Sequence, residues 1–346
     1  MPFGISGGAQ AAANNVLLRI GLAGGSVGHG EAAPLPPYNG ETQPATLGAL
    51  AAAGDWLKGQ DGRNWREIGA AFRARSGPGY GSAQCALETA LLDALARQDG
   101  VPLWRFFGGA GTELLTDMTV TTGSVDDAAR DARAIRARGI RTIKVKVGGP
   151  GGVQQDLKRV AAIHAAAPDS PLILDGNAGL SRVEAAALVR GLKAAGIAPA
   201  LLEQWLPKSD LEGMQALGAE SGWLVAADES VSTADDAERV ARARAAQVIN
   251  IKLMKGGVAA ALDIVEVARR EGLQLMIGGN VESILAMSMS ACLAAGQGGF
   301  RFADLDTPLF MAANPFAGGF TLGGERISVA GIAAGHGVVP LLPKRA

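Results

Sequence analysis

The chain has 346 residues, with 32 lysines and arginines against 33 aspartates and glutamates, so its formal net charge is −1. This balance argues against the strongly basic surface that binding to nucleic acid or to an anionic membrane requires, and leaves small molecules as the expected partners. Hydrophobic residues make up 48% of the chain and charged residues 19%, which predicts a packed globular protein of one large barrel or two modest domains.

Cysteine content and targeting signals bear on the compartment. The two cysteines, Cys85 and Cys292, are far apart in the sequence, which argues against a disulfide framework and favours a reducing environment. Residues 1–10 lack a basic segment followed by an apolar one, and no stretch approaches 18 uninterrupted apolar residues. We therefore expect a cytoplasmic protein without a membrane or nucleic-acid partner. A homo-oligomer is a separate expectation.

The first part of the chain, to about residue 110, mixes strand-like and helix-like segments. Val16–Gly21 and a segment around His29–Ala32 have the pattern of paired strands, with a break at Gly24 and Gly25. Residues 82–98 have the apolar periodicity of a helix. This part predicts an α+β unit.

From Asp117 onward, short apolar segments alternate with amphipathic helical ones. The predicted strands are Met118–Thr121, Thr142–Val147, Leu172–Leu174, Ala200–Leu202, Leu224–Ala226, Val248–Ile251, Gln274–Ile277 and Phe300–Ala303. About eight such units predict a closed parallel barrel. An open doubly wound sheet is the alternative, but the glycine-rich segment 148–152 contains Pro150 and lacks a dinucleotide-binding pattern.

Ionisable residues recur at the carboxyl ends of these strands, where parallel barrels have their active sites. Starting from Lys146, the next ones follow at intervals of 29, 28, 25 and 24 residues, the length of one strand–helix unit. The set is Lys144, Lys146, Asp175, Glu203, Asp228, Lys252, Asp304 and Asp306. Each one alone could be a solvated strand-end residue; together they predict an active site at one rim.

Three carboxylates are expected to converge from adjacent strands, namely Asp175, Glu203 and Asp228. Such a group repels itself unless a cation neutralises it, and oxygen ligands alone favour Mg²⁺, or Mn²⁺, over zinc. Three separate salt bridges are the alternative interpretation.

The lysines suggest acid–base chemistry. Lys144 and Lys146 are two residues apart on one strand, so both side chains point into the barrel. A nearby divalent cation and mutual repulsion would lower their pKa values and make a neutral amine available as a base. Lys252 is expected on the opposite side, so one lysine could remove a proton from a carbon and the other could return one to its other face.

The segments IKVK, LILDGN, LLEQ, VAADES, INIKLMKGG and DLDTPL together resemble the enolase superfamily, in its muconate-lactonizing branch, and are most similar to dipeptide epimerases. The resemblance implies a (β/α)₇β barrel over residues 113–316, an α+β capping domain over 1–112, and a segment over 317–346 that returns to the cap. It also implies Mg²⁺ on Asp175, Glu203 and Asp228, and acid–base catalysis by Lys146 and Lys252. Lys144 would assist by stabilising the enolate. The histidine-based branch is disfavoured because His29, His164 and His336 match none of its catalytic positions.

The same resemblance implies that Asp304 and Asp306 bind the free α-ammonium of a dipeptide, as two anions matching one cation. Thr119, Lys144, Gly279 and Asn280 are the other expected substrate-binding residues. The reaction would invert the α-carbon of the dipeptide's C-terminal residue. N-acylamino-acid racemases, o-succinylbenzoate synthases and cycloisomerases of the branch use the same lysines and remain alternatives; a strand-end aspartate pair can also simply cap a turn.

Substrate preference is expected from a cap loop that closes the barrel mouth in such proteins and that matches residues 4–15 here. This segment has no lysine or arginine before Arg19, so a buried acidic side chain would lack a partner, unless Lys208 reaches it. Hydrophobic or small dipeptides are therefore predicted. Trp205, in place of a usual proline, and Asn280, in place of an apolar residue, depart from the pattern. A Schiff-base aldolase using Lys252, and a non-enzymatic binding protein, are the less favoured function classes.

Overall fold

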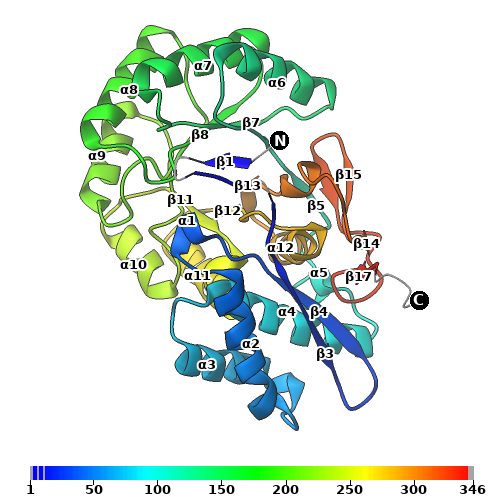
Figure 1. The fold of residues 1–346 in the computed structure, drawn as a ribbon. Helices are drawn as coiled ribbons and strands as arrows, with labels where there is room; N and C mark the ends of the chain where they lie inside the picture. The colour runs from blue at the N-terminus through cyan, green and yellow to red at the C-terminus, as the bar shows by residue number, and fades with distance from the viewer. Residues whose placement is uncertain (1–2, 6–7, 11, 342–346) are drawn as a thin grey trace.

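The structure is a computed structural model that describes residues 3–5, 8–10 and 12–341. A barrel of parallel strands forms one part of it, and a smaller α+β part with two long strands and several helices lies against the barrel (Figure 1). We call the α+β part the cap. None of the described helices combines the length and the apolar character needed to cross a membrane.

The cap is built from a strand hairpin and helices. Its elements are β3 (Val16–Gly21), β4 (Val27–Ala32), α1 (Pro36–Asn39), α2 (Gln43–Leu57), η1 (Gly62–Asn64), α3 (Trp65–Ser76), α4 (Gly81–Gln98) and α5 (Leu103–Phe106). β3 and β4 pair antiparallel with Val16 opposite Ala32, so the predicted paired strands are present. The predicted helix over residues 82–98 is α4, which begins one residue earlier.

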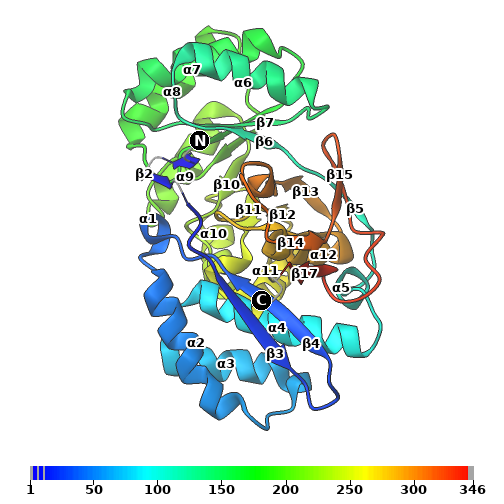
Figure 2. The same ribbon diagram turned by 45° about the vertical axis from the view of Figure 1, so that its right-hand side comes forward.

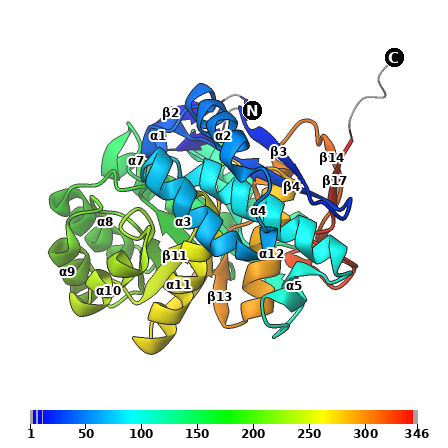
Figure 3. The same ribbon diagram turned by 90° about the horizontal axis from the view of Figure 1, so that it is seen from below.

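Glycines let β4 lie directly on α4, which crosses the molecule beneath the hairpin in Figure 3. A Cβ atom on Gly28 would come within 2.1 Å of the Ala90 carbonyl oxygen, and one on Gly30 within 1.9 Å of the Ala86 carbonyl oxygen. Both glycines are on one face of the strand because they are two residues apart. The alternation of glycine in VGHGEA therefore serves close backbone packing.

A second short hairpin precedes this unit, with β1 (Phe3–Ile5) antiparallel to β2 (Gly8–Gln10). It overlaps the segment 4–15 that was predicted to be a loop over the barrel mouth, of which residues 6, 7 and 11 lie outside the described residues. In Figure 1 the hairpin is drawn over the ring of barrel strands, and in Figures 1 and 2 it lies close to α1.

Eight parallel strands form the barrel, each hydrogen-bonded to the next in sequence order. They are β6 (Met118–Val120), β7 (Ile143–Lys146), β8 (Leu172–Asp175), β9 (Leu201–Glu203), β10 (Val225–Ala227), β11 (Val248–Ile251), β12 (Gln274–Ile277) and β13 (Phe300–Ala303). The first and last strands meet where the Asp117 N–H donates to the Ala303 carbonyl at 2.9 Å. All eight predicted strands are present, with bounds shifted by at most one residue.

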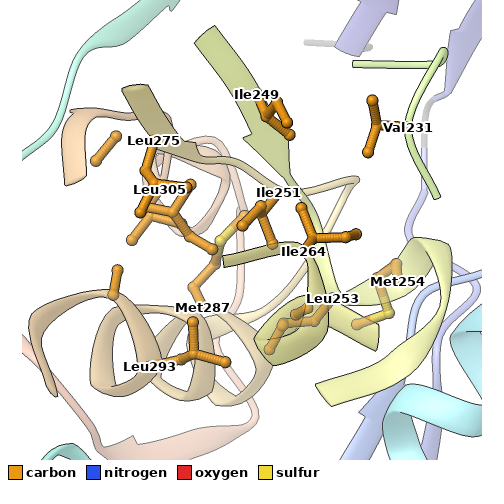
Figure 4. Close-up of a cluster of buried hydrophobic side chains, with 14 of the residues drawn as sticks. Val231, Ile249, Ile251, Leu253, Met254, Ile264, Leu275, Met287, Leu293 and Leu305 are labelled. Carbon is orange, nitrogen blue, oxygen red and sulfur yellow. The ribbon is translucent and has the colours of Figure 1, made fainter. Parts of the chain in front are cut away.

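Helices follow the first seven strands and cover the outside of the barrel (Figure 2). They are α6 (Val125–Ala137), α7 (Gly152–Ala166), α8 (Arg182–Ala194), α9 (Leu211–Ser221), α10 (Ala234–Arg242), α11 (Gly257–Arg270) and α12 (Ile284–Gln297), with 3-10 turns at η2 (Leu253–Lys255) and η3 (Thr307–Leu309). Buried apolar side chains from β11, η2, α11 and α12 form part of the core between the strands and this layer (Figure 4). The alternation of strands and helices thus forms a (β/α)₇β barrel, as predicted.

Cap acids satisfy the N-termini of two barrel helices. Glu88 of α4 accepts hydrogen bonds from the N–H groups of Val258, at 2.5 Å, and Ala259, at 3.0 Å, at the start of α11. Glu31 of β4 accepts from the N–H groups of Ser283, at 3.0 Å, and Ala286, at 3.1 Å, at the start of α12. These contacts dock the cap on one side of the barrel.

The last part of the chain forms small antiparallel sheets. β15 (Thr321–Gly323) pairs with β16 (Arg326–Ser328), which pairs with β5 (Glu113–Leu115), and β14 (Phe316–Gly318) pairs with β17 (Val338–Pro340). His336 returns to the cap, where its Nε2 lies 2.9 Å from the His29 carbonyl oxygen. The domain boundaries at 112 and 316 stay a prediction.

Candidate active site

The strand register sets the relative positions of the predicted site residues. Lys146 is paired with Asp175, and Asp175 with Glu203, at the ends of β7, β8 and β9. Asp228 and Lys252 directly follow β10 and β11. Because the carboxyl ends of parallel strands meet at one rim, this register brings the predicted residues together.

Lysine ammonium groups lie among the three carboxylates predicted to bind metal. Lys144 Nζ is 3.0 Å from Asp175 Oδ2 and 2.9 Å from Glu203 Oε2. Lys146 Nζ is 2.6 Å from Asp175 Oδ2, and Lys252 Nζ is 2.7 Å from Asp228 Oδ2. All of these side chains are buried. Lys146 and Lys252 are separated by four steps in the strand order, which in an eight-stranded barrel places them on opposite sides.

This arrangement changes the expected lysine pKa values. Burial lowers the pKa of Lys144, but the carboxylates of Asp175, Asp304 and Glu203 outweigh burial and raise it well above its usual range. Burial also lowers the pKa of Lys252, but the carboxylates of Asp228, Glu203 and Glu229 together outweigh burial and raise that pKa. The predicted lowering of lysine pKa values is therefore not found for Lys144 and Lys252, because these lysines are themselves the cations that face the carboxylates. A divalent cation bound at the carboxylate oxygens would lower the lysine pKa values, as predicted.

The carboxylates retain oxygens that suit a metal ion. Glu203 Oε2 and Asp228 Oδ2 are buried and accept no well-directed hydrogen bond, although a lysine ammonium lies near each. Burial and repulsion from Asp175 raise the pKa of Glu203 to about 7, against the attraction of Lys144. An all-oxygen donor set of Asp175, Glu203 and Asp228 fits a hard divalent cation.

Three side chains that the sequence interpretation did not single out support these ligands. Lys255 Nζ donates to the Asp228 carbonyl oxygen at 2.8 Å and lies 3.1 Å from its Oδ1. Gln204 Oε1 accepts from the Asp228 N–H at 2.8 Å. Asn250 Nδ2 donates to Glu203 Oε1 at 2.8 Å. Against the opposing effect of burial, Lys252 and Lys255 lower the pKa of Asp228 to about 2.

A second acidic group lies where β13 meets β6. Carboxylate oxygens of Asp117, Asp304 and Asp306 lie within 4.8 Å of one another, whereas Asp175, Glu203 and Asp228 do not form such a compact group among the described residues. Lys144 Nζ is 2.6 Å from Asp304 Oδ2, and the Thr119 N–H donates to Asp306 Oδ2 at 2.7 Å. Asp117 accepts no hydrogen bond on either oxygen, and Asp306 none on Oδ1. These unpartnered oxygens can accept hydrogen bonds from a cationic ligand.

Between the two groups is a cavity at the barrel mouth. Its lining combines strand-end residues with residues from the cap and from the segment after β12: Leu35, Tyr38, Thr119, Lys146, Asn177, Lys252, Gly279, Asn280, Val281, Asp304, Asp306 and Thr307. Both predicted catalytic lysines therefore face the space that holds the predicted substrate-binding residues. Lys144 is not among the lining residues and lies deeper.

The two unusual residues in the sequence have different surroundings. Asn280 is 5% exposed, and neither atom of its side-chain amide has a hydrogen-bond partner, so it can serve a polar group in the cavity. Trp205 is fully buried, and its Nε1 donates to the Leu174 carbonyl at 2.8 Å. Trp205 therefore packs beneath the rim and does not line the cavity.

Comparison with known proteins identifies the family. Residues 1–108 match the mandelate racemase/muconate lactonizing enzyme N-terminal domain, and residues 127–342 match the enolase C-terminal domain-like family. The chain belongs to the mandelate racemase/muconate lactonizing enzyme family. This confirms the resemblance to the enolase superfamily and the fold predicted from it.

Similar members of this family are dipeptide epimerases. The chain is 52% identical over 337 residues to an aromatic dipeptide epimerase of Herpetosiphon aurantiacus, covering 97% of this chain and 94% of the relative. It is 36% identical to an L-Ala-D/L-Glu epimerase of Thermotoga maritima, covering 95% and 94%. The crystal structure of a dipeptide epimerase from Enterococcus faecalis with Mg and L-Leu-L-Tyr is 30% identical, with a TM-score of 0.92 over 97% of this chain and 95% of that one.

Some of the additional site residues could have been predicted from the sequence and others could not. Asp117 directly precedes β6 and is two residues before Thr119, and Asn250 of β11 is two residues before Lys252. Alternation of side chains along the extended backbone could therefore have identified both. Lys255 owes its position to the turn η2, and Tyr38 to the docking of the cap. No periodicity predicts either of them.

Proposed function

We propose that this chain is a metal-dependent dipeptide epimerase that inverts the α-carbon of the C-terminal residue of hydrophobic or small dipeptides. The observation that carries the proposal is the placement of Lys146 and Lys252 on opposite sides of one cavity whose edge is formed by Asp304 and Asp306. The dipeptide epimerase names of the similar family members support it.

The two lysines would divide the chemistry. One, as the neutral amine, takes the α-proton of the substrate and becomes an ammonium group; the other, as an ammonium group, gives a proton to the opposite face of the same carbon. A divalent cation held by Asp175, Glu203 and Asp228 would supply positive charge that stabilises the enolate. Magnesium is supported by its presence with the dipeptide in the Enterococcus faecalis structure; manganese stays a prediction. Lys144, among the same carboxylates, would add to this stabilisation.

The acidic group after β13 would hold the α-ammonium of the substrate. Asp306 Oδ1 and both Asp117 oxygens are buried without a hydrogen-bond donor, and a primary ammonium group supplies three. An N-acylated substrate has no charge to place there. This favours free dipeptides over N-acylamino acids.

The lining of the cavity supports an apolar second side chain. Leu35 and Val281 contribute apolar surface, and the cations among the described lining residues are the two predicted catalytic lysines. Lys208, which could have paired with an acidic substrate, is exposed. The relative of higher identity is named for aromatic dipeptides, which agrees with this interpretation.

The test is a screen of dipeptides in deuterated buffer with Mg²⁺, with exchange of the α-hydrogen measured by mass spectrometry and inversion by chiral chromatography. We expect exchange and inversion with free dipeptides that end in apolar residues. Equal turnover of free and N-acetylated substrates would contradict the proposal and favour an N-acylamino-acid racemase.

The compartment and the oligomeric state are separate parts of the proposal. Both cysteines are buried and free, which supports a reducing, cytoplasmic compartment. Homo-oligomer formation stays a prediction, to be checked by light scattering.

A further inference from the structure

The cap places one aromatic side chain over a predicted catalytic base. Lys252 Nζ lies 5.2 Å from the centre of the Tyr38 ring. The Tyr38 hydroxyl donates to Asp228 Oδ1 at 3.3 Å. Tyr38 also lines the cavity that Lys146 and Lys252 face. A single cap residue therefore touches both Lys252 and the carboxylate that Lys252 pairs with.

The chain segment that carries Tyr38 is fixed at both ends. At its start, the Ala33 N–H donates to Met254 Sδ at 3.4 Å, two residues beyond Lys252. At its end, the buried carboxylate of Glu41 accepts from the Ser82 N–H at 3.0 Å and from the Thr46 hydroxyl at 3.0 Å. Between these points, Pro36 opens α1 and Gly40, with φ of 80°, ends it. This leaves the ring of Tyr38 little freedom to move.

Helix α4, which anchors Glu41, also contacts the turn that follows Lys252. α4 begins at Gly81, where a Cβ atom would come within 2.5 Å of the Lys255 carbonyl oxygen. The helix that anchors Glu41 thus packs directly on η2, the turn that follows Lys252. Tyr38 and Lys252 are therefore placed against each other by one rigid unit of α4 and η2.

Lys146 and Lys252 have different surroundings. Lys146 Nζ pairs with Asp175 at 2.6 Å. Among the described residues, Tyr38 is the one aromatic ring that lies over either lysine, and it lies over Lys252. An aromatic face attracts an ammonium group and restricts where it sits. The Tyr38 ring is thus a feature of one side of the cavity.

We propose that Tyr38 is a positioning residue for Lys252. Its ring keeps Nζ aimed at one face of the substrate's α-carbon, and its hydroxyl holds Asp228 in place. The inference rests on the proposed function, because it assigns Lys252 to proton transfer at one face. Lys252 accepts the α-proton as an amine and returns a proton as an ammonium group, and Tyr38 exchanges no proton with the substrate.

The test distinguishes the role of the Tyr38 ring from that of its hydroxyl, and proton transfer at one face of the α-carbon from transfer at the other. Each pure epimer of a dipeptide substrate is incubated in deuterated buffer, and retention with deuterium is measured separately from inversion. Lys146→Ala and Lys252→Ala show which epimer faces which lysine. Tyr38→Leu removes the ring and Tyr38→Phe removes only the hydroxyl. Tyr80→Leu is the matched control, because Tyr80 is the other tyrosine of the chain, lies in the cap and does not line the cavity.

For Tyr38→Leu we expect a defect on one side. The epimer that faces Lys146 should still exchange its α-hydrogen with retention within about twofold of the unmutated rate, while inversion falls by about tenfold or more. The epimer that faces Lys252 should lose exchange and inversion together. Tyr38→Phe should keep the normal ratio of exchange to inversion but weaken Mg²⁺ binding in calorimetric titrations. Tyr80→Leu should leave both measurements unchanged.

In a folded Tyr38→Leu protein, equal loss on both faces would overturn the inference, and so would an unchanged ratio of exchange to inversion for the epimer that faces Lys146. Tyr38→Phe, the conservative variant, keeps the assignment testable if Tyr38→Leu fails to fold: a one-sided defect in Tyr38→Phe would contradict the role given to the ring. Absence of exchange in the unmutated protein is a different result, since it would reject the proposed function itself.

Discussion

Lys144 on β7 reaches past β6 to Asp304, with Nζ 2.6 Å from Oδ2. The same ammonium group also pairs with Asp175 and Glu203. One cation therefore joins the carboxylates assigned to the metal and those assigned to the substrate's ammonium. In the functional enzyme, the metal and the substrate would both compete with Lys144 for these oxygens.

Lys144→Met is expected to separate affinity for metal from turnover. Loss of the ammonium group should tighten Mg²⁺ binding, because Asp175 and Glu203 lose a competing cation. Turnover should fall, since the enolate loses positive charge beside it. Calorimetric titration and kcat measurements check the two effects, and weaker Mg²⁺ binding in this variant would contradict the interpretation.

The contact of Lys255 with Asp228 predicts an effect on metal affinity from outside the ligand set. Lys255→Met should raise the Kd for Mg²⁺ by about 10–100-fold, because Lys255 holds Asp228 in position through its carbonyl oxygen and Oδ1, and loss of such outer partners of metal ligands typically has this effect. Asp228→Asn should be more severe and nearly abolish turnover. Full activity of Asp228→Asn with excess chelator present would show that the metal assignment is wrong.

Replacement of either predicted base should stop epimerisation. Lys146→Ala and Lys252→Ala each lack one side of the proton transfer, yet each should still exchange the α-hydrogen of the epimer that faces the remaining lysine. Deuterium incorporation into single epimers measures this. If both variants epimerise at near the unmutated rate, the two-base assignment fails.

Asp306 should contribute both affinity and pH dependence. Charge-assisted hydrogen bonds contribute roughly 1.5–3 kcal/mol each, so Asp306→Asn should raise KM by about tenfold or more, with less effect on an N-acetylated substrate. Burial and repulsion from Asp304 raise the pKa of Asp306 to about 7, against stabilisation of its charge by Thr119 and Lys144. Below that pH the carboxyl is neutral, so kcat/KM for free dipeptides should fall as the pH drops through 7. This acidic limb should be absent in Asp306→Asn.

Side-chain preference is checked by comparing kcat/KM for Ala-Glu with that for dipeptides ending in Leu, Phe or Met. An apolar residue should be preferred, because burial of a carboxylate without a cationic partner is costly. A clear preference for Ala-Glu would mean that the hairpin β1–β2 or the cavity lining provides a partner that this interpretation lacks.

The barrel could be predicted closely because its strands are short apolar segments that end in charged residues. β8 ends at Asp175 and β9 at Glu203, so each boundary coincides with a change from apolar to ionisable side chains. The register of a parallel barrel then places these residues at one rim without further information.

The supporting contacts could not be predicted in the same way. Tyr38 and Lys252 are far apart in the sequence, and their contact depends on how α4 packs on η2, a tertiary relationship with no local pattern. The ion pairs between the lysines and the carboxylates predicted to bind metal also depend on how far each lysine side chain reaches across the strands. Sequence alone indicated which residues meet, but not that Lys144 would join two groups of carboxylates.

Glu31 and Glu88 give the cap a further consequence for the barrel. Each is a cap acid that satisfies backbone N–H groups at the start of a barrel helix, α12 and α11 respectively. In a barrel expressed without the cap, these N–H groups would lose the acceptors that they have in the buried interface with the cap. The two parts therefore cannot be exchanged freely in protein engineering: a cap transplanted from another protein would have to bring both acids, at matching positions, or leave two helices without their caps.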